Sequence, residues 1–244
     1  MERQTDSPRL GFKSGVMHGL PIGMGYLSVS FSFGVLAVSL GLSWWQALLV
    51  SIANVTSAGQ VAGVGIMAAG GSLVEMAISQ LVINIRYSLM AISLSQKADD
   101  SVTKLSRVLL AYGITDEIFG VASGSGKSFS KRYFLGLMVL PLLGWFLGTF
   151  LGAIIGSVLP QILIDSLSIG IYGMFIAIVL PVARKKKGVA ITAAVAVILS
   201  LVFYYVPVFK VLSGGFATII SAVVAALIGA LLLPVDDKEA AHAD

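Results

Sequence analysis

Residues 133–158 read YFLGLMVLPLLGWFLGTFLGAIIGSV and contain no charged side chain. An apolar stretch of about 20 residues is long enough to cross the hydrocarbon core of a bilayer as a helix. A transmembrane barrel strand would instead alternate polar and apolar residues over roughly ten positions. Because backbone polar groups in hydrocarbon must be satisfied within the chain, this stretch predicts a transmembrane helix.

The composition of the whole chain indicates the same class. Of its 244 residues, 57% are hydrophobic and 11% are charged, whereas about a quarter of the residues in a soluble domain are charged. We therefore predict an all-α integral membrane protein with about eight transmembrane helices, and a count of about seven with one re-entrant segment stays open. The predicted spans are residues 14–40, 44–69, 72–95, 105–123, 132–158, 163–182, 188–206 and 214–233.

These spans form a single transmembrane domain over residues 14–233, between a cytoplasmic N-terminal segment (1–13) and a polar C-terminal tail (234–244). Cytoplasmic loops of membrane proteins carry an excess of Lys and Arg. With eight crossings and a cytoplasmic N-terminus, most of the 16 basic residues lie inside. The outer loops then hold Lys97, Lys104, Arg107 and Lys210. Apart from Arg86, which falls inside a predicted span, this distribution of basic residues in loops indicates membrane orientation and not nucleic-acid binding.

Glycine and proline mark two of the predicted spans. Glycines recur every four residues in the spans at 14–40 and 132–158, a spacing that lets helix backbones approach closely in lipid. Transporters place broken helices at matching positions of two repeated halves. We therefore predict an internal repeat, with helix breaks at Pro21, Gly23, Pro141 and Gly144.

Strongly polar residues far from any predicted helix end are few. Arg86 falls near the middle of the span at 72–95, and Asp116 and Glu117 fall near the middle of the span at 105–123. Because a charge at mid-bilayer is costly, such residues normally face a cavity or an opposite charge. Arg86 is expected to pair with one carboxylate while the other faces a pathway. The alternative is a buried ion pair that only fixes helix packing.

The same residues suit a zwitterionic substrate such as an amino acid, because a guanidinium receives a carboxylate and a carboxylate receives an ammonium group. Asp116 and Glu117 are also the candidate proton carriers. For Gln60, hydrogen bonding between helices is an equal alternative to substrate contact. The candidate substrate-binding residues are Arg86, Asn84, Gln60, Asp116, Glu117, Thr56 and Ser57.

Residue types that support other chemistry are scarce. The chain has no cysteine, which excludes a disulfide, a thiolate nucleophile or a Cys-ligated metal. Its two histidines, His18 and His242, lie far apart in the sequence, which argues against a His-based metal site. We therefore expect no metal, no cofactor and no enzymatic activity.

Three segments, in this order, carry a family resemblance: Thr56–Gln60 (TSAGQ), Ile83–Leu94 (INIRYSLMAISL) and Thr115–Phe119 (TDEIF). With them the chain resembles the AzlC-like (azaleucine-resistance) family, the large subunit of bacterial branched-chain amino-acid exporters. The resemblance covers roughly residues 12–235. Tyr87 departs from the pattern, since many relatives are expected to carry histidine there.

The resemblance implies a secondary active transporter that exports valine, leucine and isoleucine across the bacterial cytoplasmic (inner) membrane. It also implies proton-gradient driving and a small hydrophobic multispan partner subunit (AzlD-like). Three alternatives stay open. They are a channel or exporter for another small zwitterionic or ionic solute, an intramembrane enzyme, and a subunit that serves only assembly.

Overall fold

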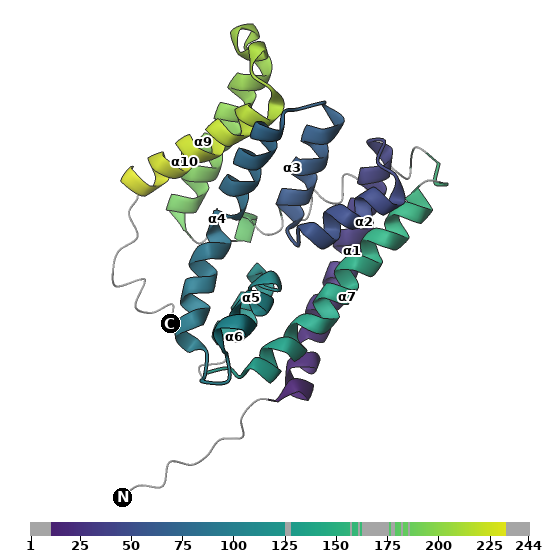
Figure 1. Cartoon of the computed structure of the whole chain (residues 1–244). Coiled ribbons are helices and arrows are strands. Elements are labelled where there is room, and N and C mark those ends of the chain that lie inside the picture. Colours follow the sequence, from purple (N-terminus) through teal and green to yellow (C-terminus); the bar gives the residue numbers. More distant parts are fainter. Residues whose placement is uncertain are drawn as a thin grey trace, which may run out of the picture. The chain divides into compact units, whose positions relative to one another are not determined.

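The computed structural model (Figure 1) describes residues 11–124, 128–156, 158–160, 162, 176, 179–181, 183–184 and 186–232. Its regular structure there is helical, so the predicted all-α class is confirmed. Within these residues, five helices are long and apolar enough to cross a membrane. They are α1 (Phe12–Ser39), α4 (Leu73–Lys97), α7 (Lys131–Gly156), α9 (Lys187–Tyr205) and α10 (Gly214–Leu232). The predicted span at 163–182, the segment 1–10 and the tail lie almost wholly outside the described residues.

The chain divides into two compact units. One comprises residues 1–60 and 84–164, and the other comprises residues 61–83 and 165–244. The first unit contains all seven residues that the sequence nominates for substrate binding, from Thr56 to Glu117. The candidate site can therefore be described within one unit.

In the first unit α1 and α7 pack side by side and run in the same direction (Figure 1). A Cβ atom added at Gly15 would touch the backbone of Tyr133 and Leu137, and one added at Gly34 would touch that of Thr149 and Ala153. Small residues allow this close approach, as the glycine spacing predicted. Residue numbers rise together along both helices, so the packing is parallel.

The helix breaks predicted in these two helices are wrong. Helix α1 continues through Pro21 and Gly23, and α7 continues through Pro141 and Gly144. The glycines serve the contact between the helices instead, since Cβ atoms at Gly23 and Gly144 would each clash with the backbone of the facing helix. Such tight packing holds the helix together where proline removes a backbone hydrogen bond.

The chain is interrupted elsewhere, within the predicted span at 44–69. Helices α2 (Trp44–Ala53) and α3 (Ser57–Ala68) are separated by Asn54, Val55 and Thr56. The Nε2 atom of Gln60 donates to Ser51 Oγ at 2.6 Å, although these residues would be about 13.5 Å apart along one straight helix. The chain therefore bends back at the break. Two β-branched residues after an asparagine disfavour helix at this point.

The predicted span at 105–123 is also wrong as a single crossing, because it forms a helical hairpin of α5 (Lys104–Tyr112) and α6 (Asp116–Gly124). The chain before α5 is bonded to the chain after α6. Asp99 N donates to Phe129 O at 3.0 Å, and Lys131 N donates to Ser101 Oγ at 2.9 Å. The hairpin therefore starts and ends at the same place. We call these two hydrogen bonds the hairpin clip.

With the hairpin, the basic residues near α5 lie at a different end of the helices from the one that the sequence predicted. Lys97 and Lys104 flank the clip at the start of α7, and the start of α1 packs there too, since Gly136 faces Phe12. The eight-crossing count had placed Lys97, Lys104 and Arg107 on the opposite side from Lys13. Within the first unit, the structure puts the start of α1, the end of α4 and the ends of the hairpin together, so that assignment is corrected. The described basic residues Lys13, Lys97, Lys104 and Lys131 of that unit lie at this one end.

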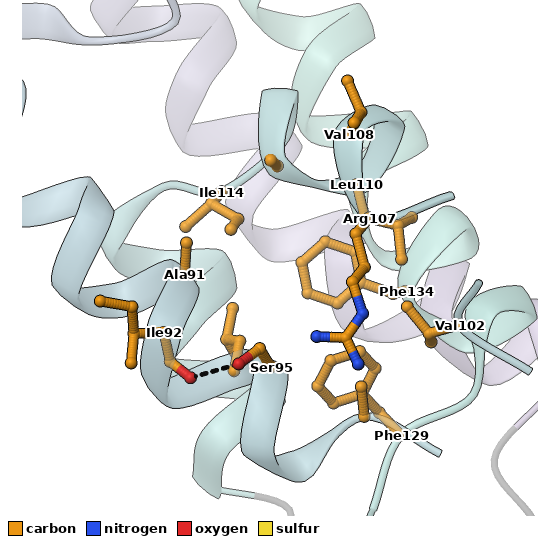
Figure 2. Close-up of a pocket in the computed structure, with 13 residues that line it drawn as sticks. Ala91, Ile92, Ser95, Val102, Arg107, Val108, Leu110, Ile114, Phe129 and Phe134 are labelled. Carbon is orange, nitrogen blue, oxygen red and sulfur yellow. Dashed lines mark hydrogen bonds between the residues drawn. The ribbon is translucent and has the colours of Figure 1, made fainter. Parts of the chain in front are cut away.

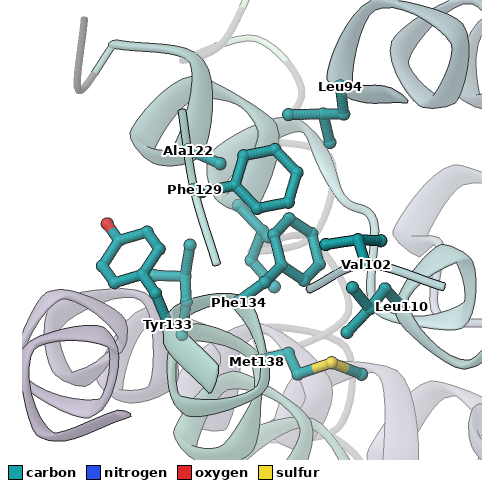
Figure 3. Packing of buried hydrophobic residues seen from close by; sticks show 10 residues of the cluster. Leu94, Val102, Leu110, Ala122, Phe129, Tyr133, Phe134 and Met138 are labelled. Atoms are coloured by element: carbon teal, nitrogen blue, oxygen red, sulfur yellow. The ribbon is translucent and has the colours of Figure 1, made fainter. Parts of the chain in front are cut away.

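An apolar cluster holds the hairpin against α7 (Figure 3). Phe129 and Phe134 lie with ring centroids 5.2 Å apart, and Met138 packs against Gly113 at the turn between α5 and α6. Its other buried members are Leu94, Val102, Leu110, Ile118, Ala122, Tyr133 and Leu137. The cluster fixes the position of the α6 N-terminus.

The second unit contains α9, α10 and the 3-10 turn Pro207–Val211. Gly229, late in α10, packs on Thr192, early in α9, so these two helices are antiparallel. The buried Glu75 carboxylate accepts a hydrogen bond from the Ser213 hydroxyl, at the start of α10.

Candidate functional site

An ion pair joins α4 to the N-terminus of α6. Arg86 Nη1 lies 3.0 Å from Asp116 Oδ2 and donates to Oδ1 at 3.1 Å. The carboxylate that pairs with Arg86, which the sequence left open, is therefore that of Asp116. Both side chains are 47% exposed within the chain, so the pair is accessible to a ligand. A single guanidinium nitrogen serves both carboxylate oxygens, which leaves further N–H groups of the fork for other acceptors.

Tyr87 connects this pair to the first helix break. The Arg86 guanidinium carbon lies 5.0 Å from the Tyr87 ring centroid, and Arg86 Nη2 donates to the Tyr87 hydroxyl at 3.3 Å. The side chain of Thr56 lies near the same hydroxyl. Thr56 is buried in the break between α2 and α3. The predicted site residue Thr56 is thus brought to the ion pair through an aromatic ring.

Glu117 faces the other way, toward α1. Its Oε2 atom accepts a short hydrogen bond from the Tyr26 hydroxyl, which also lies 2.6 Å from Thr115 Oγ1. The Tyr26 ring packs edge-on against Trp145 of α7, with centroids 5.0 Å apart. The two adjacent carboxylates therefore have different partners. Asp116 faces a cation, and Glu117 faces neutral hydroxyl groups.

Both carboxylates lie in the first turn of α6 because the hairpin turn breaks the helix just before them. Gly113 ends α5, and Thr115 caps α6 by accepting from Ile118 N at 3.3 Å. The positive end of a helix dipole stabilises negative charge within the first turn. A second contact joins the two helix breaks, since the Tyr112 hydroxyl donates to Ile52 O at 2.8 Å. The charged site thus lies where two interrupted helices meet.

Gln60 belongs to a different cluster. Its amide donates to Ser51, whose hydroxyl lies 2.5 Å from that of Thr149 on α7, and all three side chains are fully buried. Gln60 thus makes the hydrogen bonds between helices that we predicted as the alternative to substrate contact. Ser57 begins α3, and Asn84 lies on α4 two residues before Arg86.

Sequence reasoning did not identify Tyr26 or Trp145 as site residues. The available signal was the Tyr26 hydroxyl within an otherwise apolar helix, because a buried tyrosine hydroxyl needs a hydrogen-bond partner. Among the described residues, no group of three or more His, Asp or Glu side chains is placed to hold a metal ion.

The fold and the site define a helical membrane protein with an accessible ion pair between interrupted helices. The family model described as AzlC protein matches residues 21–159, which is more than half of the chain. The chain therefore belongs to the AzlC family, as the resemblance in three segments predicted.

Similar curated proteins are also membrane proteins. The inner membrane protein YgaZ of Escherichia coli (strain K12) is 28% identical over 219 residues, which cover 85% of this chain and 89% of that protein. An uncharacterized membrane protein of Archaeoglobus fulgidus is 31% identical over 134 residues, 55% of this chain and 58% of its own. One of Helicobacter pylori (strain 26695) is 31% identical over 110 residues, 45% of this chain and 47% of its own. No solved structure matches the chain.

Proposed function

We propose that the protein is a secondary active transporter that exports branched-chain amino acids across the bacterial inner membrane. The observation that carries the proposal is the Arg86–Asp116 pair at the junction of two interrupted helices. Transporters use such half-helices to build substrate sites near the bilayer midplane. Membership of the AzlC family supports a transporter over an enzyme.

A zwitterionic substrate can enter by exchanging one internal ion pair for two new ones. Its carboxylate would take the place of Asp116 on the Arg86 guanidinium, and its ammonium group would bind the released Asp116 carboxylate. Every charge is paired both before and after this exchange, which keeps the cost of burial low. Tyr87, already against Arg86, would position the guanidinium.

Glu117 is the better candidate for the proton carrier. Protonation of Asp116 would leave Arg86 without its counter-ion, whereas the described partners of Glu117 are the neutral hydroxyls around Tyr26. A carboxyl group that gains or loses a proton there changes no ion pair. We therefore assign substrate binding to Asp116 and proton coupling to Glu117. The sequence had named both carboxylates as candidates for both roles.

A small hydrophobic multispan subunit of the AzlD-like type is the proposed partner, and the N-terminus is proposed to be cytoplasmic. The basic end formed by Lys13, Lys97, Lys104 and Lys131 supports that orientation under the positive-inside rule.

The test is efflux of preloaded labelled leucine from cells that express the chain with its candidate partner. Removing a charge-assisted hydrogen bond costs about 1.5–3 kcal/mol, so Arg86→Ala should lower the efflux rate about tenfold or more. Arg86→Lys should recover part of it, and Lys187→Gln, an exposed charge at the start of α9, is the matched control.

The two carboxylates are separated by a second measurement. Glu117→Gln should abolish stimulation by an imposed proton gradient while leaving exchange of labelled for unlabelled leucine intact. Asp116→Asn should impair both. Leucine flux that does not saturate and ignores an uncoupler would favour a channel instead. No branched-chain efflux from well-expressed protein with its partner would refute the proposed substrate.

A further inference from the structure

A cavity apart from the ion pair lies between α4 and α5, at the basic end of the first unit (Figure 2). Its volume is about 370 Å³, within the range of about 300–1,000 Å³ typical of ligand sites. The walls are the apolar side chains of both helices, and Phe129 and Phe134 of the apolar cluster contribute aromatic surface. The cavity suits a flexible hydrocarbon group.

One charged side chain lines this cavity. Arg107 reaches from α5 toward the part lined by Ser95 and Phe129 (Figure 2). Among the described residues Arg107 has no ion pair, and the carboxylate of Asp99, on the preceding loop, accepts two hydrogen bonds from Ser101. The Ser95 hydroxyl donates to Ile92 O at 2.7 Å, which leaves its oxygen able to accept but not to donate. The guanidinium is therefore the group free to bind an anion.

The rim of the cavity is apolar and faces outward. Ile92 on α4 is 59% exposed, and Val108 on α5 is 73% exposed. Leu105 and Leu109 extend the same exposed surface along α5. In a membrane-spanning chain such a surface contacts lipid. Basic residues beside it, such as Lys104, are typical of the level of the headgroups, where long side chains reach the interface.

We propose that this cavity binds an anionic phospholipid, with one acyl chain between α4 and α5 and the phosphate on Arg107. Basic pockets between helices on the cytoplasmic side of membrane proteins bind acidic headgroups. The exported amino acid fits poorly, because the lining offers one cation and no carboxylate for an ammonium group. A free inorganic anion would gain nothing from the apolar walls.

The test is lipid binding to purified, delipidated protein, measured by native mass spectrometry without any transport step. The probes are phosphatidylglycerol and phosphatidylcholine with the same acyl chains. Wild-type protein should bind phosphatidylglycerol at least tenfold more tightly. Arg107→Gln should remove most of that preference, and Arg107→Lys should restore part of it. Arg132→Gln, an exposed arginine at the same end and outside the cavity lining, should leave it unchanged.

A second variant tests the hydrocarbon part of the site. Ala91→Leu fills the cavity while leaving Arg107 in place, so it should weaken binding of both lipids. This variant also keeps the proposal testable if Arg107→Gln is poorly folded. Equal binding of phosphatidylglycerol to the wild type and to Arg107→Gln would overturn the proposal. So would displacement of the lipid by leucine, which would make the cavity part of the transport pathway.

Discussion

The close approach of α1 and α7 gives a prediction whose size follows from the geometry. A Cβ atom at Gly34 would lie 2.6 Å from Ala153 N, with Thr149 O closer still, whereas real Cβ contacts stay above 3.0 Å. Gly34→Ala therefore forces the two backbones apart by at least 0.4 Å. Neither backbone can yield as a flexible side chain would, so the expected cost is that of overpacking, about 1–3 kcal/mol.

Gly25→Ala is the matched control, because Gly25 lies in the same helix with nothing near the added atom. Both variants gain the same helix propensity, about 0.8–1.0 kcal/mol, so their difference isolates the overpacking. In a chain of this size about 1 kcal/mol corresponds to roughly 2–4 °C. Thermal unfolding in detergent should therefore place Gly34→Ala several degrees below Gly25→Ala. Equal midpoints would refute the close parallel packing.

Three further predictions concern the site and the hairpin. Because the chain lacks cysteine, Lys104→Cys and Lys131→Cys, which lie on either side of the hairpin, can be labelled singly. An impermeant maleimide should reach both from the same side; labelling from opposite sides would restore a crossing at 105–123. In a double-mutant cycle on thermal unfolding of the substrate-free protein, Arg86→Ala with Asp116→Ala should cost no more than the worse single variant, since both residues act there through one ion pair, and additive losses would contradict this. Tyr26→Phe keeps the aromatic packing and removes the hydroxyl that contacts Glu117 and Thr115, so chemical unfolding should show a loss of about 1 kcal/mol, and no change would argue against those contacts.

The apolar stretches predicted the long helices well, because hydrophobicity over about 20 residues depends only on local sequence. The glycine spacing predicted that α1 and α7 would each approach another helix closely, but not that they would pack against each other. It did not predict that Pro21 and Pro141 would be accommodated. Each proline is tolerated because the facing helix packs closely against the backbone around it. This packing between two helices is not visible in the sequence of either helix alone.

The hairpin of α5 and α6 is a larger difference between the sequence-based prediction and the structure. The stretch at 105–123 is long and largely apolar, although it contains Arg107, Asp116 and Glu117, and it predicts a crossing. Its local sign of a turn is Gly113 followed by Thr115. The turn is fixed by contacts distant in sequence, such as that between Gly113 and Met138. For the same reason the sequence identified Arg86 and two carboxylates but could not choose between Asp116 and Glu117. Their partners come from α4 and α1, on opposite sides of the α6 N-terminus.

The hairpin clip has a consequence for biosynthesis. A chain that crossed the bilayer at 105–123 would have to carry Lys104 and Arg107 to the far side while the protein is being made. Passing a basic side chain through the centre of the bilayer costs about 2.5–3.5 kcal/mol on insertion scales. A hairpin whose two ends stay tied together at Phe129 and Asp99 avoids that step. We therefore expect α5 and α6 to enter the membrane after the flanking helices have been inserted, with no charge translocated.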